Sequence, residues 1–292
     1  MSTRLATVAC VDILAASNAL GAVVHGVDLR HAQTEATWAQ LRTELRRSLL
    51  LVFPGQDIDD DQHVDAVAHF GPIAYEGKHE RQRVMHVSNR RPDGLLGADA
   101  ASFHIDYGFF PHPYEALSLY GLEVPKQGAE TWYINAVLAA RTLRPELRQQ
   151  LHHLQARHVL VLGPEHGQDR VRVRTGRCDD SHAHQVRPVL WPHRDTGAEI
   201  LGVWEQQTDA ILPLAPAEST ELIELLFAHL YQPQHMYVHR WNVGDLVVWD
   251  NHAVQHGRPA VATEQARTLR RVCIGETQDL SIFARHRETS DI

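Results

Sequence analysis

Residues 102–108 read SFHIDYG, and in this short run a strand pattern coincides with metal-binding side chains. Successive side chains of an extended chain point to opposite faces, so His104 and Asp106 would share one face of a strand. The apolar and aromatic residues around them would occupy the other face. The pattern therefore predicts a β-strand that presents an imidazole and a carboxylate side by side, as two ligands of one metal ion.

A third ligand is expected from a distant strand of the same fold. The strand-like run GDLVVWD is followed closely by His256, within the sequence WDNHAVQHGRP. Two histidines and one carboxylate on one side of an iron(II) ion leave positions open for O2 and a chelating cosubstrate. His104, Asp106 and His256 are therefore the predicted metal ligands.

The next strand-like run, ARTLRRVCIG, places Arg267, Leu269 and Arg271 on one face of a strand. Burying a guanidinium is costly unless it has a partner of opposite charge. Two inward arginines therefore indicate an anionic partner, and a carboxylate held in a bidentate fork is the natural one.

These motifs together resemble the taurine dioxygenase and 2,4-dichlorophenoxyacetate dioxygenase family of iron(II)- and 2-oxoglutarate-dependent oxygenases. The H-x-D pair, the distal His256 and arginines eleven and fifteen residues beyond it follow the family's order. The resemblance extends over most of the chain, through the runs LLLVFPGQ, HFGPI, HID, GAETWY, HRWNVGDLVVWDN and RTLRRV.

The resemblance implies a role for each matching residue. His104, Asp106 and His256 would bind iron(II), and Arg267 would hold the distal carboxylate of 2-oxoglutarate. Thr131, in the run GAETW, would hydrogen-bond the same carboxylate. Arg271 is expected near the substrate or near the metal-bound end of the cosubstrate.

The implied reaction hydroxylates, or cleaves through hydroxylation, an unactivated C–H position of a small organic substrate that carries a carboxylate. Succinate and CO2 would be released. Desaturation is an alternative outcome of the same cofactor chemistry.

Two other classes of protein stay open: a jelly-roll binding protein without catalysis, and a zinc hydrolase, for which the sequence offers no recognisable general base. The stretch 71–102 lacks the family's sulfonate-binding residues, so taurine is not the expected substrate.

A second H-x-D pair, His193 and Asp195, competes with the first. It precedes Thr196 and Gly197 between two apolar runs, so turn formation accounts for it. Trp249 and Asn251 are expected to support His256, the first by packing and the second by shaping the turn. The aromatic cluster Tyr107, Phe109 and Phe110 has two interpretations, a pocket of low polarity or a packed strand end.

The pattern of elements favours a mixed α/β fold that is mainly β. Leucines and a tryptophan recur at helical spacing from about residue 35 to 49, and another amphipathic helix carries Leu222, Leu225, Leu226 and Leu230 on its apolar side. Many short strands separated by Gly- and Pro-containing turns predict a double-stranded β-helix (jelly-roll) core with flanking helices. We expect one domain over residues 1–292, in which the long polar segment 163–185 is either a solvated hairpin or an active-site lid.

Composition limits the partners. The chain of 292 residues has a formal net charge of −8, which disfavours nucleic-acid binding and favours a small-molecule substrate. No signal-peptide core or membrane span is evident at the N-terminus, and the three cysteines are too far apart for a disulfide framework. We therefore expect a cytoplasmic protein without membrane contact, and the sequence allows a homo-oligomer.

Overall fold

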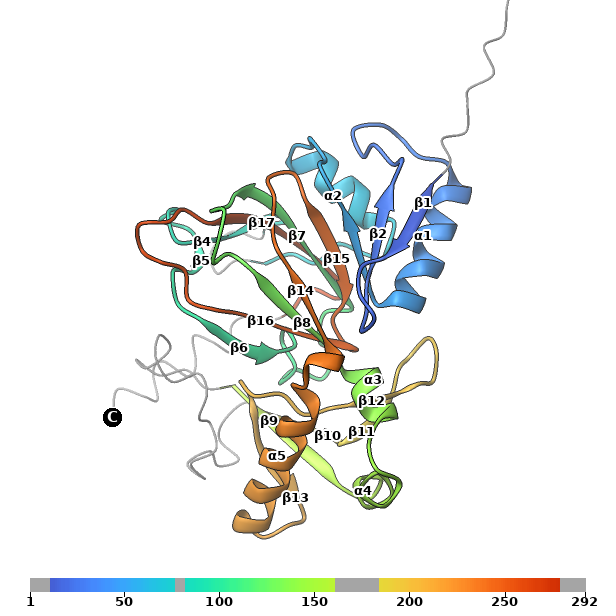
Figure 1. Ribbon diagram of the computed structural model, residues 1–292, viewed down its shortest axis with the longest axis vertical. Helices are drawn as coiled ribbons and strands as arrows, with labels where there is room; N and C mark the ends of the chain where they lie inside the picture. Colours follow the sequence, from blue (N-terminus) through green and yellow to red (C-terminus); the bar gives the residue numbers. More distant parts are fainter. Residues whose placement is uncertain (1–10, 77–81, 161–183, 279–292) are drawn as a thin grey trace, which may run out of the picture.

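Two β-sheets form the larger part of the molecule in this computed structural model, which describes residues 11–76, 82–160 and 184–278 (Figure 1). The larger sheet has eight strands in the order β1 (Asp12–Ala15), β2 (Ala22–His25), β3 (Leu50–Phe53), β15 (Leu246–Asp250), β7 (Ala116–Glu123), β17 (Thr268–Ile274), β4 (Met85–Ser88), β5 (Leu95–Leu96). The smaller sheet has four, in the order β14 (Met236–His239), β8 (Thr131–Asn135), β16 (Val254–Arg258), β6 (Ala101–His104). Pairing is antiparallel except between β2 and β3 and between β4 and β5.

The larger sheet is buried on both faces, as strand β3 illustrates. Leu50 and Val52 belong to the core cluster shared with the smaller sheet, whereas Leu51 and Phe53 belong to a second cluster under two helices. These helices are α1 (Glu35–Ser48) and α2 (Asp60–Ala68). Because every side chain of β3 is buried, the strand reads as a continuous apolar run rather than an alternating one.

Helix α1 forms where the sequence predicts it. The Thr34 side chain accepts a hydrogen bond from the Thr37 backbone N–H and caps its start. Trp38, Leu41 and Leu45 lie on the buried face at helical spacing. The helix ends at Leu49, which takes the left-handed conformation with φ of 65°.

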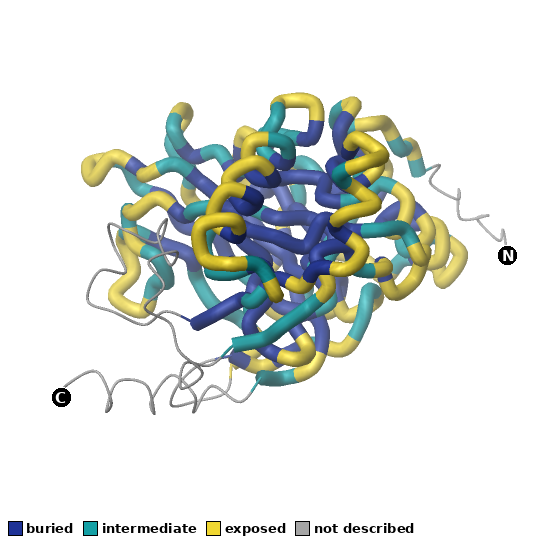
Figure 2. The backbone as a smooth tube through the Cα atoms, turned by 90° about the horizontal axis from the view of Figure 1, so that it is seen from below, coloured by how far each residue is buried: buried dark blue, intermediate teal, exposed yellow. Residues whose placement is uncertain are grey.

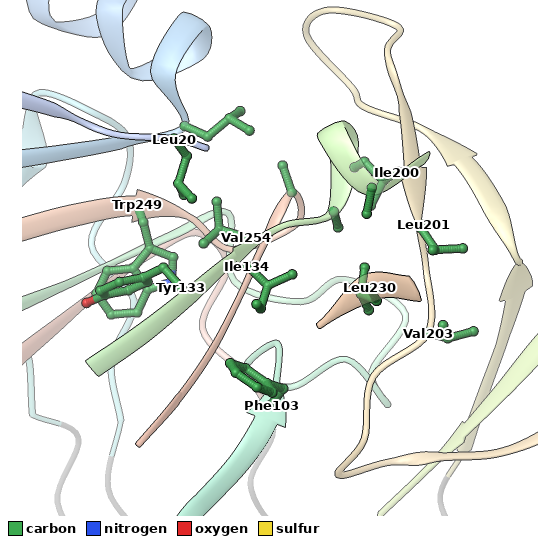
Figure 3. Close-up of a cluster of buried hydrophobic side chains, with 14 of the residues drawn as sticks. Leu20, Phe103, Tyr133, Ile134, Ile200, Leu201, Val203, Leu230, Trp249 and Val254 are labelled. Atoms are coloured by element: carbon green, nitrogen blue, oxygen red, sulfur yellow. The ribbon is translucent and has the colours of Figure 1, made fainter. Parts of the chain in front are cut away.

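The remaining elements form a second layer below the two sheets in Figure 1. They are α3 (Ala136–Arg141), α4 (Pro145–Leu151), β9 (Gln155–Val159), β10 (His184–Pro188), β11 (Leu190–Pro192), β12 (Glu199–Leu201), β13 (Thr208–Leu212), α5 (Pro216–Leu230) and the 3-10 helix η1 (Pro233–His235). One core cluster continues from the sheets into this layer (Figure 3), from Tyr133 and Trp249 to Leu201 and Leu230. The two layers therefore share apolar contacts.

The backbone is buried through the centre of the sheets, and exposed segments lie mostly in loops and on the outer faces of helices (Figure 2).

The predicted fold class, mainly β with flanking helices, is confirmed. The jelly-roll topology and the single domain over residues 1–292 stay predictions. Most of the predicted lid lies outside the described residues, because the description stops at 160 and resumes at 184. Across the described residues, no helix combines the length and apolar character that crossing a membrane requires.

Candidate metal centre

Strand pairing brings the two candidate histidine ligands together. Strand β6 ends at His104, and its antiparallel neighbour β16 places His256 directly opposite. Residues directly opposite in an antiparallel pair project to the same side of the sheet. The two imidazole rings accordingly lie 4.2 Å apart between centroids. Sequence positions that are 152 residues apart thus become neighbours through the register of one strand pair.

Asp106 reaches the same place through a turn and not through the strand. The predicted strand over 102–108 is too long, because β6 ends at His104 and Asp106 lies in the turn that follows. The backbone of Tyr107 has a φ of 58°, which reverses the chain. Asn251 holds this turn: its Oδ1 accepts from the Asp106 N–H at 2.9 Å, and its Nδ2 donates to the Asp106 carbonyl at 3.0 Å.

One ligand atom from each of His104, Asp106 and His256 lies within 4.8 Å of the other two. The Nε2 atom of His104 is 3.2 Å from Asp106 Oδ1, and the Nε2 atom of His256 is 4.0 Å from the same oxygen. In the described part of the chain, this is the one group of three or more His, Cys, Asp or Glu side chains close enough to share a metal ion.

The protonation states fit a divalent metal. Nδ1 of His104 lies 2.7 Å from the Ser102 carbonyl, so this nitrogen carries the proton and Nε2 keeps its lone pair. Burial lowers the pKa of His256 to about 3, which keeps its imidazole neutral. Burial alone would raise the pKa of Asp106, but Arg271 and the two histidines outweigh it and lower that pKa. Two imidazoles and one carboxylate are a donor set suited to iron(II).

Arg271 lies beside Asp106 and is surrounded by carboxylates. Its Nη1 is 2.7 Å from Asp106 Oδ2, although the pair does not have hydrogen-bond geometry. Its Nε and Nη2 donate to Glu76 at 3.0 and 3.1 Å in a bidentate fork. Sequence reasoning missed Glu76, because an isolated glutamate carries no motif and approaches the site only through the fold.

Arg267 and Thr131 meet at a second position between the two sheets. Arg267 Nη2 donates to Thr131 Oγ1 at 3.2 Å, and its Nε donates to the Ala129 carbonyl at 3.4 Å. Thr131 Oγ1 also accepts from Trp241 Nε1 at 2.9 Å, so its own hydroxyl proton is available to a further acceptor. Burial, assisted by the nearby Arg258, lowers the pKa of Arg267 to about 9.

The competing pair, His193 and Asp195, does not assemble a metal site. His193 is buried, its Nε2 lies 3.0 Å from Asp250 Oδ2, and its Nδ1 accepts from the Asp195 and Thr196 N–H groups. Its role is to connect the β11–β12 hairpin to the end of β15. The turn interpretation of this sequence is confirmed by the antiparallel pairing of β11 with β12.

Two supporting residues differ in their roles. Trp249 packs against His256 with ring centroids 5.0 Å apart, as expected. Asn251, which the sequence predicts to support His256, instead holds the turn of Asp106 and donates to the Tyr114 carbonyl. In the aromatic cluster, Phe109 and Phe110 are buried and pack with Leu160.

Comparison with known proteins identifies the family. Residues 12–273 match the taurine catabolism dioxygenase TauD, TfdA family. The chain is 31% identical to pentalenolactone F synthase of Streptomyces arenae over 282 residues, which covers 87% of this chain and 91% of that protein. It is 29% identical to (S)-phenoxypropionate/alpha-ketoglutarate-dioxygenase of Sphingobium herbicidovorans, covering 84% of this chain and 88% of that protein.

Solved structures agree with the sequence match. A taurine dioxygenase from Burkholderia xenovorans superimposes with a TM-score of 0.76 at 25% identity, covering 90% of each chain. AAD-2 in complex with Mn(II) and N-oxalylglycine shares the fold, with a TM-score of 0.73 at 23% identity and coverage of 92% of this chain and 98% of that chain. The chain therefore belongs to the TauD/TfdA family and is an Fe(II)- and 2-oxoglutarate-dependent dioxygenase.

Proposed function

We propose that the protein hydroxylates an unactivated C–H position of a small organic substrate, or cleaves the substrate through that hydroxylation, with release of succinate and CO2. In this proposal His104, Asp106 and His256 hold the iron. Arg267 and Thr131 hold the distal carboxylate of 2-oxoglutarate. The observation that carries the proposal is a buried guanidinium to which the described part of the chain offers no acidic partner.

That guanidinium belongs to Arg267, whose exposed fraction is 3%. Over residues 11–76, 82–160 and 184–278, no carboxylate forms an ion pair with it; its side chain donates to a carbonyl and a hydroxyl. A buried charge that lacks a counterion is strongly unfavourable, so this arrangement makes sense when an anion occupies the site. The fork of Arg267 and the free proton of Thr131 would together supply three hydrogen bonds to one carboxylate.

The position of Thr131 suits a short dicarboxylate. Thr131 and Tyr133 lie two residues apart on β8, so their side chains share a face of the sheet. Tyr133 is the register partner of His256. Thr131 is therefore about 7 Å along the strand from the level of His256. This spacing suits a cosubstrate that reaches from the metal to the carboxylate pocket.

The bound iron would supply O2 activation coupled to oxidative decarboxylation of 2-oxoglutarate. The protein's own residues contribute orientation and exclusion of water. Ser102 fixes the His104 tautomer, Asn251 holds the Asp106 turn, and Trp249 packs on the His256 ring. Each of these contacts limits the motion of one ligand, which keeps the reacting groups in a fixed geometry.

The names of the relatives support the substrate class of this proposal, and desaturation stays the alternative outcome. The relatives include a 2,4-dichlorophenoxyacetate dioxygenase, a phenoxypropionate dioxygenase and a sulfate ester dioxygenase, all named as dependent on alpha-ketoglutarate. These names support a small organic substrate here. The sequence also suggested a substrate carboxylate that meets Arg271. The contacts of Arg271 do not support that detail, since all three of its nitrogens already face Glu76 or Asp106.

An anaerobic titration tests the proposal. Iron(II) and 2-oxoglutarate added to the purified protein should produce the weak visible charge-transfer band of a chelated keto acid. Arg267→Met should raise the 2-oxoglutarate dissociation constant by about 100-fold, since it removes a buried charge-assisted contact. The exposed Arg240→Met is the matched control and should leave the band unchanged.

Two further variants locate the metal. Asp106→Ala should abolish the band and the release of succinate, and Thr131→Val should weaken 2-oxoglutarate binding by roughly tenfold. A normal band in Asp106→Ala, or normal cosubstrate affinity in Arg267→Met, would contradict the assignment of these residues.

A further inference from the structure

Each of the three nitrogens of Arg271, the cation beside the candidate iron ligands, lies against a carboxylate. Nε and Nη2 donate to the two oxygens of Glu76, and Nη1 faces Asp106 Oδ2. Arg271 and Glu76 are both largely buried, with side-chain exposed fractions of 12% and 7%. A bidentate pair at this depth is held more firmly than a surface ion pair.

Glu76 is itself held in place by further contacts. Cys273 Sγ lies 3.1 Å from its Oε2, and the Tyr107 hydroxyl lies 3.5 Å from its Oε1. Its backbone forms a β-bridge with Gln82. These contacts come from β17, from the turn after β6 and from the segment before β4. Cys273 and Tyr107 therefore hold the carboxylate of Glu76, and the bridge to Gln82 fixes the backbone that carries it.

The charges of this group decide what it can accept. Glu76 neutralises the guanidinium of Arg271 in a bidentate pair, and Asp106, whose charge iron(II) would balance, lies against Nη1. A further carboxylate, brought by a substrate to this guanidinium, would meet the charge of Glu76 at its Nε and Nη2 edge. Like charges placed together in a partly buried site disfavour binding strongly.

We propose that Glu76 occupies the anion-binding face of Arg271 and thereby makes the enzyme selective for substrates that are uncharged at the position facing Arg271. This inference rests on the proposed function and specifies its substrate class.

A matched pair of probes tests this selectivity. Phenylacetate and phenylacetamide have nearly the same shape and differ in charge. Their dissociation constants are measured by anaerobic calorimetry on the enzyme loaded with iron(II) and 2-oxoglutarate. The wild-type enzyme should bind the amide at least as tightly as the acid. Glu76→Gln releases the guanidinium, so it should shift the ratio of the two constants toward the acid by roughly tenfold or more.

Two variants serve as controls. Glu199→Gln removes a carboxylate that is paired with Arg148 outside the site, at 2.7 Å, and should leave the ratio unchanged. The double variant Glu76→Gln with Arg271→Gln lacks the cation as well, and it should lose the gain in acid affinity. The single variant could fold poorly, because it leaves the guanidinium of Arg271 without its Glu76 partner. The double variant avoids this problem, since it removes both charges of the pair together.

The outcomes separate the two proposals. Uptake of iron(II) and 2-oxoglutarate is measured first, and its absence in the wild-type enzyme would overturn the proposed function together with this inference. With that uptake intact, a wild-type preference for phenylacetate overturns the role of Glu76 alone. The same holds if Glu76→Gln shows no gain in acid affinity relative to the amide.

Discussion

At the scale of single residues, Asn251 illustrates how much one buried side chain can organise. Its amide group bonds the N–H and the carbonyl of Asp106 and the carbonyl of Tyr114, at distances between 2.9 and 3.0 Å. The strand ends at His104, two residues before Asp106, so nothing in β6 itself would hold the Asp106 carboxylate toward the histidines. The amide of Asn251 takes the place of the missing ladder bonds.

Replacement of Asn251 by alanine should therefore affect both stability and metal binding. Three buried backbone groups would lose their partners, and we expect a loss of about 3 kcal/mol in the free energy of unfolding. Iron(II) affinity should fall by roughly 10- to 100-fold, because a ligand loses its support. Urea denaturation and an anaerobic metal titration measure the two effects, with the exposed Asn18→Ala as control. Unchanged iron affinity would show that the turn holds without the amide.

Buried histidines away from the site make stability depend on pH. His158 stacks on Trp204 with centroids 3.7 Å apart, and its Nδ1 lies 3.1 Å from Thr208 Oγ1. Burial lowers its pKa well below 6.5. His63 is also fully buried, and burial together with Arg270 lowers its pKa in the same direction. Both are neutral in the folded protein and can take up a proton only on unfolding.

The sign of the effect follows from this difference. Each of the two histidines contributes stability that is complete above pH 6.5 and is lost as the pH falls below it, at up to about 1.4 kcal/mol per pH unit. His193, whose pKa is raised by its hydrogen bond to Asp250, acts in the opposite direction. We therefore compare the wild type with His158→Phe, a variant that keeps an aromatic ring on Trp204 but has no imidazole to take up a proton. Its unfolding free energy should fall less steeply between pH 6.5 and 5.5 than that of the wild type, and equal slopes would contradict the assignment.

At the scale of elements, strand β17 separates the arginines by face. Arg271 points to the candidate site, and the adjacent Arg270 points to helix α2. Arg270 donates to the Ile58 carbonyl at 2.8 Å, to Asp60 at 2.7 Å and to His63 Nδ1 at 3.1 Å, and its guanidinium lies 4.4 Å from the centre of the Tyr120 ring. Sequence reasoning singled out the inward arginines and overlooked this one, which joins α2 to the outer face of the sheet.

Arg270→Met should loosen that helix without touching the site. We expect a loss of about 3 kcal/mol in unfolding free energy, because the Ile58 carbonyl and His63 would lose a buried charged donor. The affinity for 2-oxoglutarate should stay within about twofold of the wild type, since the change lies on the opposite face of β17. Denaturation and cosubstrate titration measure the two quantities. Arg83→Met is the control, because Arg83 forms an exposed pair with Asp61 next to the same helix.

At the scale of the whole molecule, the candidate site joins the two sheets. His104 and His256 come from the smaller sheet, whereas Arg271 comes from the larger one. Arg267, directly before β17, donates to Thr131 of the smaller sheet. A metal and a dicarboxylate bound at these residues would therefore add to the contacts that join the two sheets.

Ligand binding should accordingly raise the melting temperature. With Mn(II) as an oxygen-stable substitute and 2-oxoglutarate at about 100 times its dissociation constant, mass action adds about 2.7 kcal/mol. For a chain of this size that corresponds to an increase of roughly 4 to 5 °C. Chelation of the metal should reverse it. Calorimetric scans should show a much smaller shift in Arg267→Met, and an equal shift would indicate that 2-oxoglutarate binds elsewhere.

The sequence alone was enough to predict much of the local structure of this protein. Helix α1, the short strands and the hairpin of β11 and β12 follow from local periodicity and turn residues, which act over a few positions. The grouping of His104, Asp106 and His256 was also predictable, because a metal site permits few residue types. The role of Arg267 at the cosubstrate stays a prediction.

Only the tertiary structure decided what surrounds those residues. The strand predicted over 102–108 ends at His104. Beyond it, Asn251 from a distant turn bonds the backbone of Asp106 in place of a neighbouring strand, and no local pattern encodes that contact. Glu76 meets Arg271 across 195 positions of sequence, through a buried ion pair that depends on how β17 packs. The type of side chain that can bind a metal is a local chemical property and can be read from the sequence. The charge around that side chain depends on residues from distant parts of the sequence, and only folding brings these residues together.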